Sequence, residues 1–200
     1  MNYVGPVELS LRTSRPAPKP SKDLPSDVLP IFACDPGGTT GWSLMLLPAL
    51  LNGNPIFNYP QEVVVAAKKR WWHGEINCYE EDYGVYQLIK ILEQWPSAAV
   101  IFEDFFVRQM AVDLSPIRII SKVEYYLWTQ GRRMLKQQAG HAKPAISNER
   151  MKVWGIYTSE HALQHARDAD RHAFFFMRRC LGSGNKARAL RKEAFPNVYG

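Results

Sequence analysis

Acidic side chains stand at the ends of two apolar segments that are far apart in the sequence. Asp35 follows the apolar run 31–34 and opens a glycine-rich turn, and Glu103 follows the run 98–102. Both runs are apolar enough to be buried strands, so a carboxylate at the end of each is costly unless it binds a cation or a donor. A third acid, Asp168, lies on an amphipathic segment near the C-terminus. Carboxylates that converge without an equal number of bases predict Mg²⁺ or Mn²⁺, hard ions that take oxygen ligands.

Helical geometry groups further polar residues with Asp168. On a helix, His165, Asp168 and His172 fall on one face, beside a stripe of small apolar residues that lets the helix pack close to a sheet. Asp168 is then at the edge of the buried face. Asp170 falls nearly opposite, so we expect it to be solvated or paired with an arginine and not to be a ligand.

The elements that must carry these groups follow from the periodicity of the apolar residues. Five segments have the short apolar runs of strands: 31–35, 42–47, 62–65, 98–103 and 145–147. Four segments have helical spacing or helix-end residues: 80–94, 115–130, 149–154 and 160–179. Because the first two strands are close enough to form a hairpin, the order predicts an α/β fold with a mixed five-stranded sheet, an antiparallel start and flanking helices.

One compact domain with flexible ends fits a chain of 200 residues with 46% hydrophobic content. We expect a basic, proline-rich, flexible arm over 1–29, a folded domain over 30–182 and a basic tail over 183–200. No apolar stretch is long enough to cross a bilayer and the N-terminus lacks a signal-peptide pattern, so a cytoplasmic protein without membrane contact is expected. Three cysteines without CxxC spacing predict buried apolar residues, with neither a disulfide framework nor a zinc site.

An excess of basic residues favours a polyanionic partner. The chain has 25 Lys and Arg against 19 Asp and Glu, a net charge of +6. If the acids gather around metal, the rest of the surface is more basic still, and an acidic pocket in a basic surround is what a nuclease needs. Lys68, Lys69 and Arg70 precede two tryptophans and could contact DNA. An exposed charged edge strand that prevents aggregation is the competing interpretation.

The acidic motifs resemble those of the RuvC branch of the RNase H-like nucleases. The turn that opens at Asp35 is similar to the family's first-strand motif, and Glu103 after its strand is similar to the second acidic position. The pattern His165-x-x-Asp168 followed by alanine is similar to the motif of the family's terminal helix. The resemblance covers roughly residues 31–180.

The resemblance implies an RNase H-like fold and hydrolysis of phosphodiester bonds in branched DNA, which is Holliday junction resolution. In such enzymes the acids hold two divalent ions. The matching positions make Asp35 the bridging ligand and Glu103 and Asp168 the flanking ligands. His165 becomes a ligand or a base that positions water. Mg²⁺ is the implied cofactor, with Mn²⁺ as the alternative.

The resemblance also implies residues that face DNA. Phe106 falls where resolvases of this family carry an aromatic that stacks on a base, although packing under a lid also explains it, and Arg108 follows in the same segment. Lys152 is similar to a family lysine in the short helix before the catalytic one. Symmetric cutting of two strands implies a homodimer. Its candidate interface is the apolar face of the predicted helix 115–130, which core packing explains equally well. The short length and the tails resemble resolvases encoded by bacteriophages.

Other function classes share parts of this pattern. Sugar and acetate kinases of the actin-like fold use Asp-x-Gly-Gly-Thr to hold ATP phosphates, and residues 35–39 fit it. Those enzymes need a second equivalent domain, for which 200 residues leave no room. Another RNase H-like nuclease, acting on an RNA–DNA hybrid or a flap, is a closer alternative. A branched-DNA binding module without catalysis would predict the loss of an acid, and none is lost.

Overall fold

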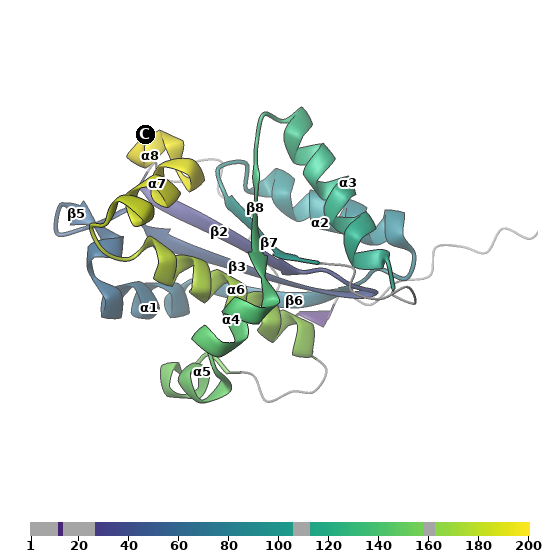
Figure 1. The fold of residues 1–200 in the computed structure, drawn as a ribbon, viewed down its shortest axis with the longest axis horizontal. Helices are drawn as coiled ribbons and strands as arrows, with labels where there is room; N and C mark the ends of the chain where they lie inside the picture. The colour runs from purple at the N-terminus through teal and green to yellow at the C-terminus, as the bar shows by residue number, and fades with distance from the viewer. Residues whose placement is uncertain (1–11, 14–26, 106–112, 158–162) are drawn as a thin grey trace, which may run out of the picture.

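The computed structural model describes residues 12–13, 27–105, 113–157 and 163–200 and contains one mixed sheet (Figure 1). Its main strands are β2 (Val28–Asp35), β3 (Thr39–Pro48), β6 (Trp71–Asn77), β7 (Ala99–Asp104) and β8 (Met134–Gln138). The short β1 (Arg12–Thr13) joins at the edge, giving the order β1-β6-β3-β2-β7-β8. β3 is antiparallel to β2 and β6, whereas β2, β7 and β8 are parallel. This confirms the predicted mixed sheet of five main strands with an antiparallel start, and β1 is an added edge strand.

Helices cover both faces of the sheet, as Figure 1 shows. α2 (Glu81–Gln94) and α3 (Ser115–Thr129) pack on one face. The helices on or beside the other face are α1 (Pro60–Lys69), α4 (Ala139–Ala145), α5 (Asn148–Trp154), α6 (Gln164–Cys180), α7 (Asn185–Ala194) and α8 (Pro196–Tyr199). A 3₁₀ turn, Ile56–Asn58, follows the small hairpin of β4 (Leu50–Leu51) and β5 (Asn54–Pro55).

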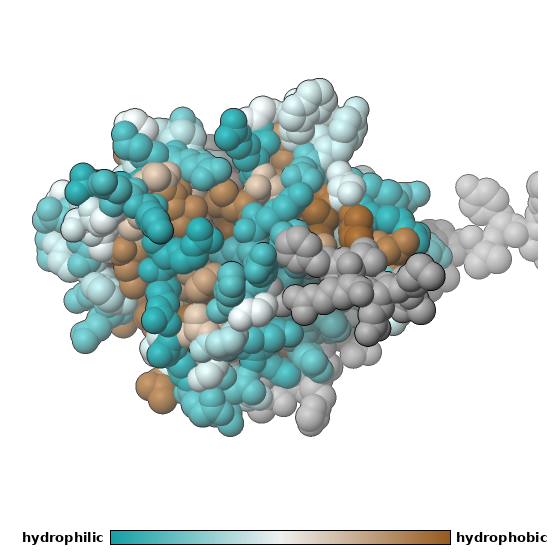
Figure 2. Space-filling view, viewed as in Figure 1, coloured by the Kyte–Doolittle hydropathy of each residue, from teal (hydrophilic) through white to brown (hydrophobic). Residues whose placement is uncertain are grey.

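Alternation along β2 explains why the central strands are apolar throughout. Ile31 and Ala33 belong to the core under α6, whereas Phe32 and Cys34 belong to the core under α2 and α3. Successive side chains of a strand point to opposite faces, so a strand covered on both sides needs a continuous apolar run. Hydrophilic residues are widespread on the face shown in Figure 2, with hydrophobic ones visible between them.

Two of the predicted strands are wrong. Residues 62–65 lie in α1, where Pro60 occupies the first turn and Val63 and Ala67, four residues apart, are buried on one side. The strand in this region is β6, which begins at Trp71. Residues 145–147 end α4 and begin the cap of α5, and the fifth main strand is β8, paired with β7.

The C-terminal segment expected as a basic tail forms α7 and α8. Phe195 between them is buried, and the Tyr199 hydroxyl donates to the Ala49 carbonyl at 3.1 Å. On α3, Ile120, Val123 and Leu127 are buried in the core, which confirms the core interpretation of that apolar face.

All three cysteines are free and buried, as expected. Among the described residues, no helix has both the length and the apolar character needed to cross a membrane.

Candidate active site

Asp35 and Glu103 meet at one edge of the sheet. β2 and β7 are parallel neighbours that pair Cys34 with Phe102, so the next residue of each strand lies at the same edge. The two carboxyl groups are within hydrogen-bonding reach of each other. Burial raises the pKa of Asp35 to about 6; a hydrogen bond with His165 opposes this shift, and the nearby Glu103 charge adds to it. The end of the two strands therefore holds negative charge that is poorly compensated.

His165 is held against Asp35 by the sheet. Its Nδ1 lies 2.9 Å from Asp35 Oδ2, and its backbone N–H donates to Glu75 Oε1 at 2.8 Å. Gly41, paired with Glu75 across β3 and β6, makes this approach possible, because a Cβ there would lie 2.0 Å from the His165 carbonyl oxygen. The Asp35 hydrogen bond is the main cause that raises the pKa of His165, although burial opposes it.

Glu103 has a second histidine partner that the sequence did not assign to the site. His172 Nε2 lies 3.0 Å from Glu103 Oε2, and His172 Nδ1 lies 3.1 Å from Gln137 Oε1. Burial alone would raise the pKa of Glu103, but hydrogen bonds with His172 and Asp35 outweigh it and lower the pKa. The available signal was the helical face that His172 shares with His165 and Asp168.

Asp168 lies on the same side of α6 as His165 and His172, but it forms ion pairs with two basic side chains. Lys143 Nζ lies 3.2 Å from its Oδ2, and Arg171 donates to its Oδ1. Arg171 also donates to Asn148 Oδ1. Burial works against the Lys143 ammonium, yet Asp168, Glu103 and Asp35 more than offset it and raise the pKa of Lys143. Lys143 thus shows that this position stabilises a cation.

The residues fit a divalent cation in chemistry, although not as a preformed ligand set. Asp35 and Glu103 can both supply oxygen ligands, and the pKa of Asp35 is raised chiefly by burial, with a further contribution from the Glu103 charge. In the described part of the chain, no three His, Cys, Asp or Glu side chains are arranged to hold one metal ion. The reason is that Asp168 is directed to Lys143 and Arg171. A role for Asp168 as a third ligand would require it to exchange these partners.

The predicted DNA contacts that lie in the described residues are not beside these acids. Phe106 and Arg108 lie outside the described residues. Lys152 is exposed on α5, with its Nζ 5.0 Å from the Tyr157 ring centroid, so the lysine beside the acids is Lys143 of α4.

The basic patch of Lys68, Lys69 and Arg70 is exposed at the end of α1. The Arg70 carbonyl accepts from the Leu46 N–H at 3.0 Å, five residues along β3 from the position opposite Asp35. The patch therefore lies away from the acidic edge, and it is not on an edge strand.

The expectation for Asp170 is wrong. This residue is fully buried, accepts from Trp71 Nε1 at 2.7 Å, and lies 2.7 Å from His73 Nδ1. Helical spacing placed it opposite Asp168, but α6 also packs against β6, so this side of the helix faces the sheet and not water. Asp170 ties α6 to β6.

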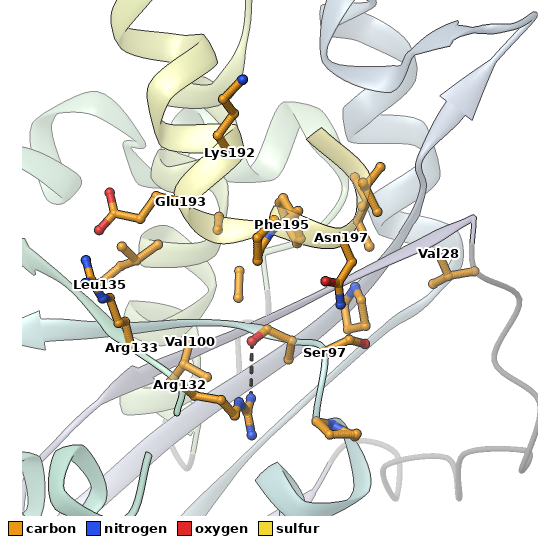
Figure 3. A pocket seen from close by; sticks show the side chains of 18 of the residues that line it. Val28, Ser97, Val100, Arg132, Arg133, Leu135, Lys192, Glu193, Phe195 and Asn197 are labelled. Atoms are coloured by element: carbon orange, nitrogen blue, oxygen red, sulfur yellow. Dashed lines mark hydrogen bonds between the residues drawn. The ribbon is translucent and has the colours of Figure 1, made fainter. Parts of the chain in front are cut away.

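A cavity of about 620 Å³ lies at the opposite ends of β2 and β7 (Figure 3). Its lining includes Val28, Val100, Phe195 and Arg132. The Arg132 guanidinium donates to the Leu92, Trp95 and Ala98 carbonyl oxygens, so its charge fixes the turn before β7. This cavity is separate from the acids.

Comparison with known proteins returned structural similarities only. No protein-family model and no curated protein matches the chain. RuvC of Thermus thermophilus in complex with Holliday junction substrate aligns at 12% identity, over 82% of this chain and 94% of that chain, with a TM-score of 0.46. A second Thermus thermophilus RuvC structure aligns at 15% identity, over 82% and 95%, with a TM-score of 0.47. At these identities the similarity concerns the backbone and not the site.

Proposed function

We propose that this protein is a metal-dependent endonuclease that hydrolyses phosphodiester bonds in branched DNA, as a Holliday junction resolvase does. The observation that supports it is the closeness of Asp35 and Glu103 at the ends of two parallel strands, with Asp168 nearby on α6, where Lys143 and Arg171 hold it. The acids have the order and the elements of the motifs that they resemble. Carboxylates for a metal and cations for phosphate are both required for this chemistry.

Each residue at the acidic edge has a role in this proposal. Asp35 and Glu103 hold Mg²⁺ or Mn²⁺, and Asp168 joins them on release from Lys143. The ions, when bound, supply an activated water and stabilise the leaving oxygen. His165 orients Asp35 through its Nδ1 and, with a side chain 43% exposed, can exchange a proton with water. Lys143, once released, can face a substrate phosphate.

The proposed function also includes a DNA-binding surface, an oligomeric state and a location. Phe106, Arg108, Lys152 and the patch 68–70 contact branched DNA away from the cleaved bond. The active form is a homodimer, because two symmetric cuts need two equivalent sites. Because the short length and the tails resemble resolvases encoded by bacteriophages, we expect the protein to act in the cytoplasm of a bacterial host.

A cleavage assay tests the proposal. Labelled four-way junction, linear duplex and RNA–DNA hybrid are incubated with the full chain in Mg²⁺, Mn²⁺ or EDTA. Asp35→Asn is the inactivating variant. Asp27→Asn, at an exposed residue just before β2, is the matched control.

We expect paired, metal-dependent nicks in the junction that disappear in Asp35→Asn and remain in Asp27→Asn. Binding without cutting in either metal would make the protein a DNA-structure binding module. Preferential loss of the RNA strand of the hybrid would make it an RNase H type nuclease.

A further inference from the structure

His172 bridges two neighbouring strands directly behind the acidic edge. It lies one helical turn after Asp168 on α6, and its side chain is 1% exposed. Its ring nitrogens reach Glu103 at the end of β7 and Gln137 of β8, which are paired with each other across the two strands. A buried ring with one polar partner on each nitrogen has a fixed orientation.

The hydrogen-bond chemistry fixes the direction of the contact with Glu103. An ionised carboxylate only accepts, so His172 Nε2 must carry the hydrogen. A neutral ring then needs a donor at Nδ1, which the Gln137 amide provides when its oxygen and nitrogen exchange places. The Gln137 Nε2 has no partner in the orientation given, which favours this exchange. With a protonated ring, Nδ1 instead donates to Gln137 Oε1, and the bond from Nε2 to Glu103 is the same.

This contact engages one of the two Glu103 carboxylate oxygens. Oε2 receives the His172 hydrogen bond, and the carboxyl group also contacts Asp35. The side chain of Glu103 is 16% exposed, so it is mostly covered by neighbours and only part of it faces solvent. Residues that hold a metal ligand in orientation commonly change metal affinity about 10–100-fold when they are replaced.

We propose that His172 is a positioning residue, which holds the Glu103 carboxylate in its ligand orientation, and that Gln137 holds the His172 ring. Because Glu103 is a ligand only under the proposed function, this inference depends on that function. Neither the acidic motif nor its resemblance assigns a role to His172 or Gln137.

Two substitutions at the same position separate the two contacts of the ring. The amide nitrogen of glutamine can reach the place of the ring Nε2, so His172→Gln keeps a donor to Glu103. The shorter asparagine reaches the place of Nδ1, so His172→Asn keeps the contact with Gln137 and loses the one with Glu103. Mn²⁺ binding is measured by calorimetry, together with the unfolding temperature in EDTA and the metal dependence of nicking.

We expect His172→Asn to weaken Mn²⁺ binding about 10–100-fold and His172→Gln to retain most of the affinity. The apparent KM for metal should rise more than kcat falls. Equal loss of affinity in both variants, in step with their unfolding temperatures, would make His172 a packing residue and overturn the inference. Unchanged affinity in His172→Asn would overturn it as well.

Two further variants complete the design. Glu103→Gln should lose both Mn²⁺ binding and cutting; wild-type behaviour there would mean that the proposed function itself is wrong, whatever His172 does. Gln137→Met keeps the volume of a buried side chain and removes the contact with the ring. It should weaken Mn²⁺ binding less than His172→Asn does. If neither His172 variant folds, unchanged Mn²⁺ affinity in Gln137→Met overturns the inference, and weakened affinity supports it.

Discussion

Asp35 is an acid whose folded environment works against its charge. Burial, with a smaller contribution from Glu103, raises its pKa from 3.8 to about 6, despite the opposing hydrogen bond from His165. The folded pKa exceeds the unfolded one, so the contribution of Asp35 to stability is fully present below about pH 4 and is lost as the pH rises through about 6. Negative charge at this edge is therefore unfavourable without a cation.

Asp35→Asn should stabilise the metal-free protein at neutral pH. The substitution removes the charge that burial penalises, and the loss of the His165 partner reduces the gain, so we expect about 1–3 kcal/mol above about pH 7 and almost none near pH 4. Urea unfolding in EDTA across this range measures it. A variant that is less stable than the wild type at about pH 8 would mean that the bond with His165 outweighs the cost of burial.

Asp170→Ala should be strongly destabilising, because it leaves the buried His73 ring and the partly buried Trp71 N–H without their hydrogen-bond partner. We expect a loss of about 3–5 kcal/mol. Asp82→Ala is the matched control: Asp82 is 93% exposed and pairs with Lys122 on the surface. That pair should contribute at most about 1 kcal/mol. Equal losses of unfolding free energy in the two variants would contradict the assignment of Asp170 as the tie between α6 and β6.

At the scale of elements, the start of α6 depends on close contact with β3. Gly41→Ala would place a Cβ 2.0 Å from the His165 carbonyl oxygen, which belongs to backbone and cannot rotate away. We expect a loss of about 3 kcal/mol and a displaced His165. Gly140→Ala on α4 meets nothing within 4 Å and should be neutral or slightly stabilising. Thermal unfolding and nicking rates compare the two; a stable, active Gly41→Ala would show that α6 can shift without loss of the site.

The strongest elements and the acids were predictable from the sequence, because their signals are local. β2 and β7 have continuous apolar runs that end in Asp35 and Glu103, and α6 has helical periodicity and contains Asp168. Three consecutive valines in α1 favour a strand, because β-branched residues are common in strands. The segment is nevertheless a helix, because one side of it packs on the core. β8 has only one buried residue among its five and forms by pairing with β7, which no local pattern reveals.

The site residues that were missed depend on tertiary contacts. Lys143 reaches Asp168 from a helix 25 residues earlier in the chain, and Gln137 reaches His172 across 35 residues. Neither lies in a motif, so their role follows only from the way that α4 and β8 pack against α6. The acidic motif predicts the candidate metal ligands, but it does not predict the side chains that form hydrogen bonds or ion pairs with the residues of the site.

At the scale of the whole molecule, the two ends of the parallel strands β2 and β7 have different neighbours. The ends that carry Asp35 and Glu103 adjoin the cations of α4 and α6, whereas the starts of β2 and β7 lie beside α7 and α8. The C-terminal segment is rich in Lys and Arg, which predicts a basic tail outside the folded domain. Its apolar residues instead join the core under α6: Phe195 lies 6.2 Å from Phe176 and 6.3 Å from Phe57 between ring centroids.

Phe195→Ala should therefore cost about 3–5 kcal/mol of unfolding free energy, the usual range for a buried aromatic side chain. Lys186→Ala, at an exposed basic residue of α7, should leave stability unchanged and, if this residue contacts phosphate, reduce the salt dependence of DNA binding. Urea unfolding and binding titrations at several salt concentrations measure both. If the segment were a free basic tail, Phe195→Ala would not change the unfolding free energy. A loss of about 3–5 kcal/mol would mean that α7 and α8 belong to the folded domain and that their basic residues lie on a fixed surface.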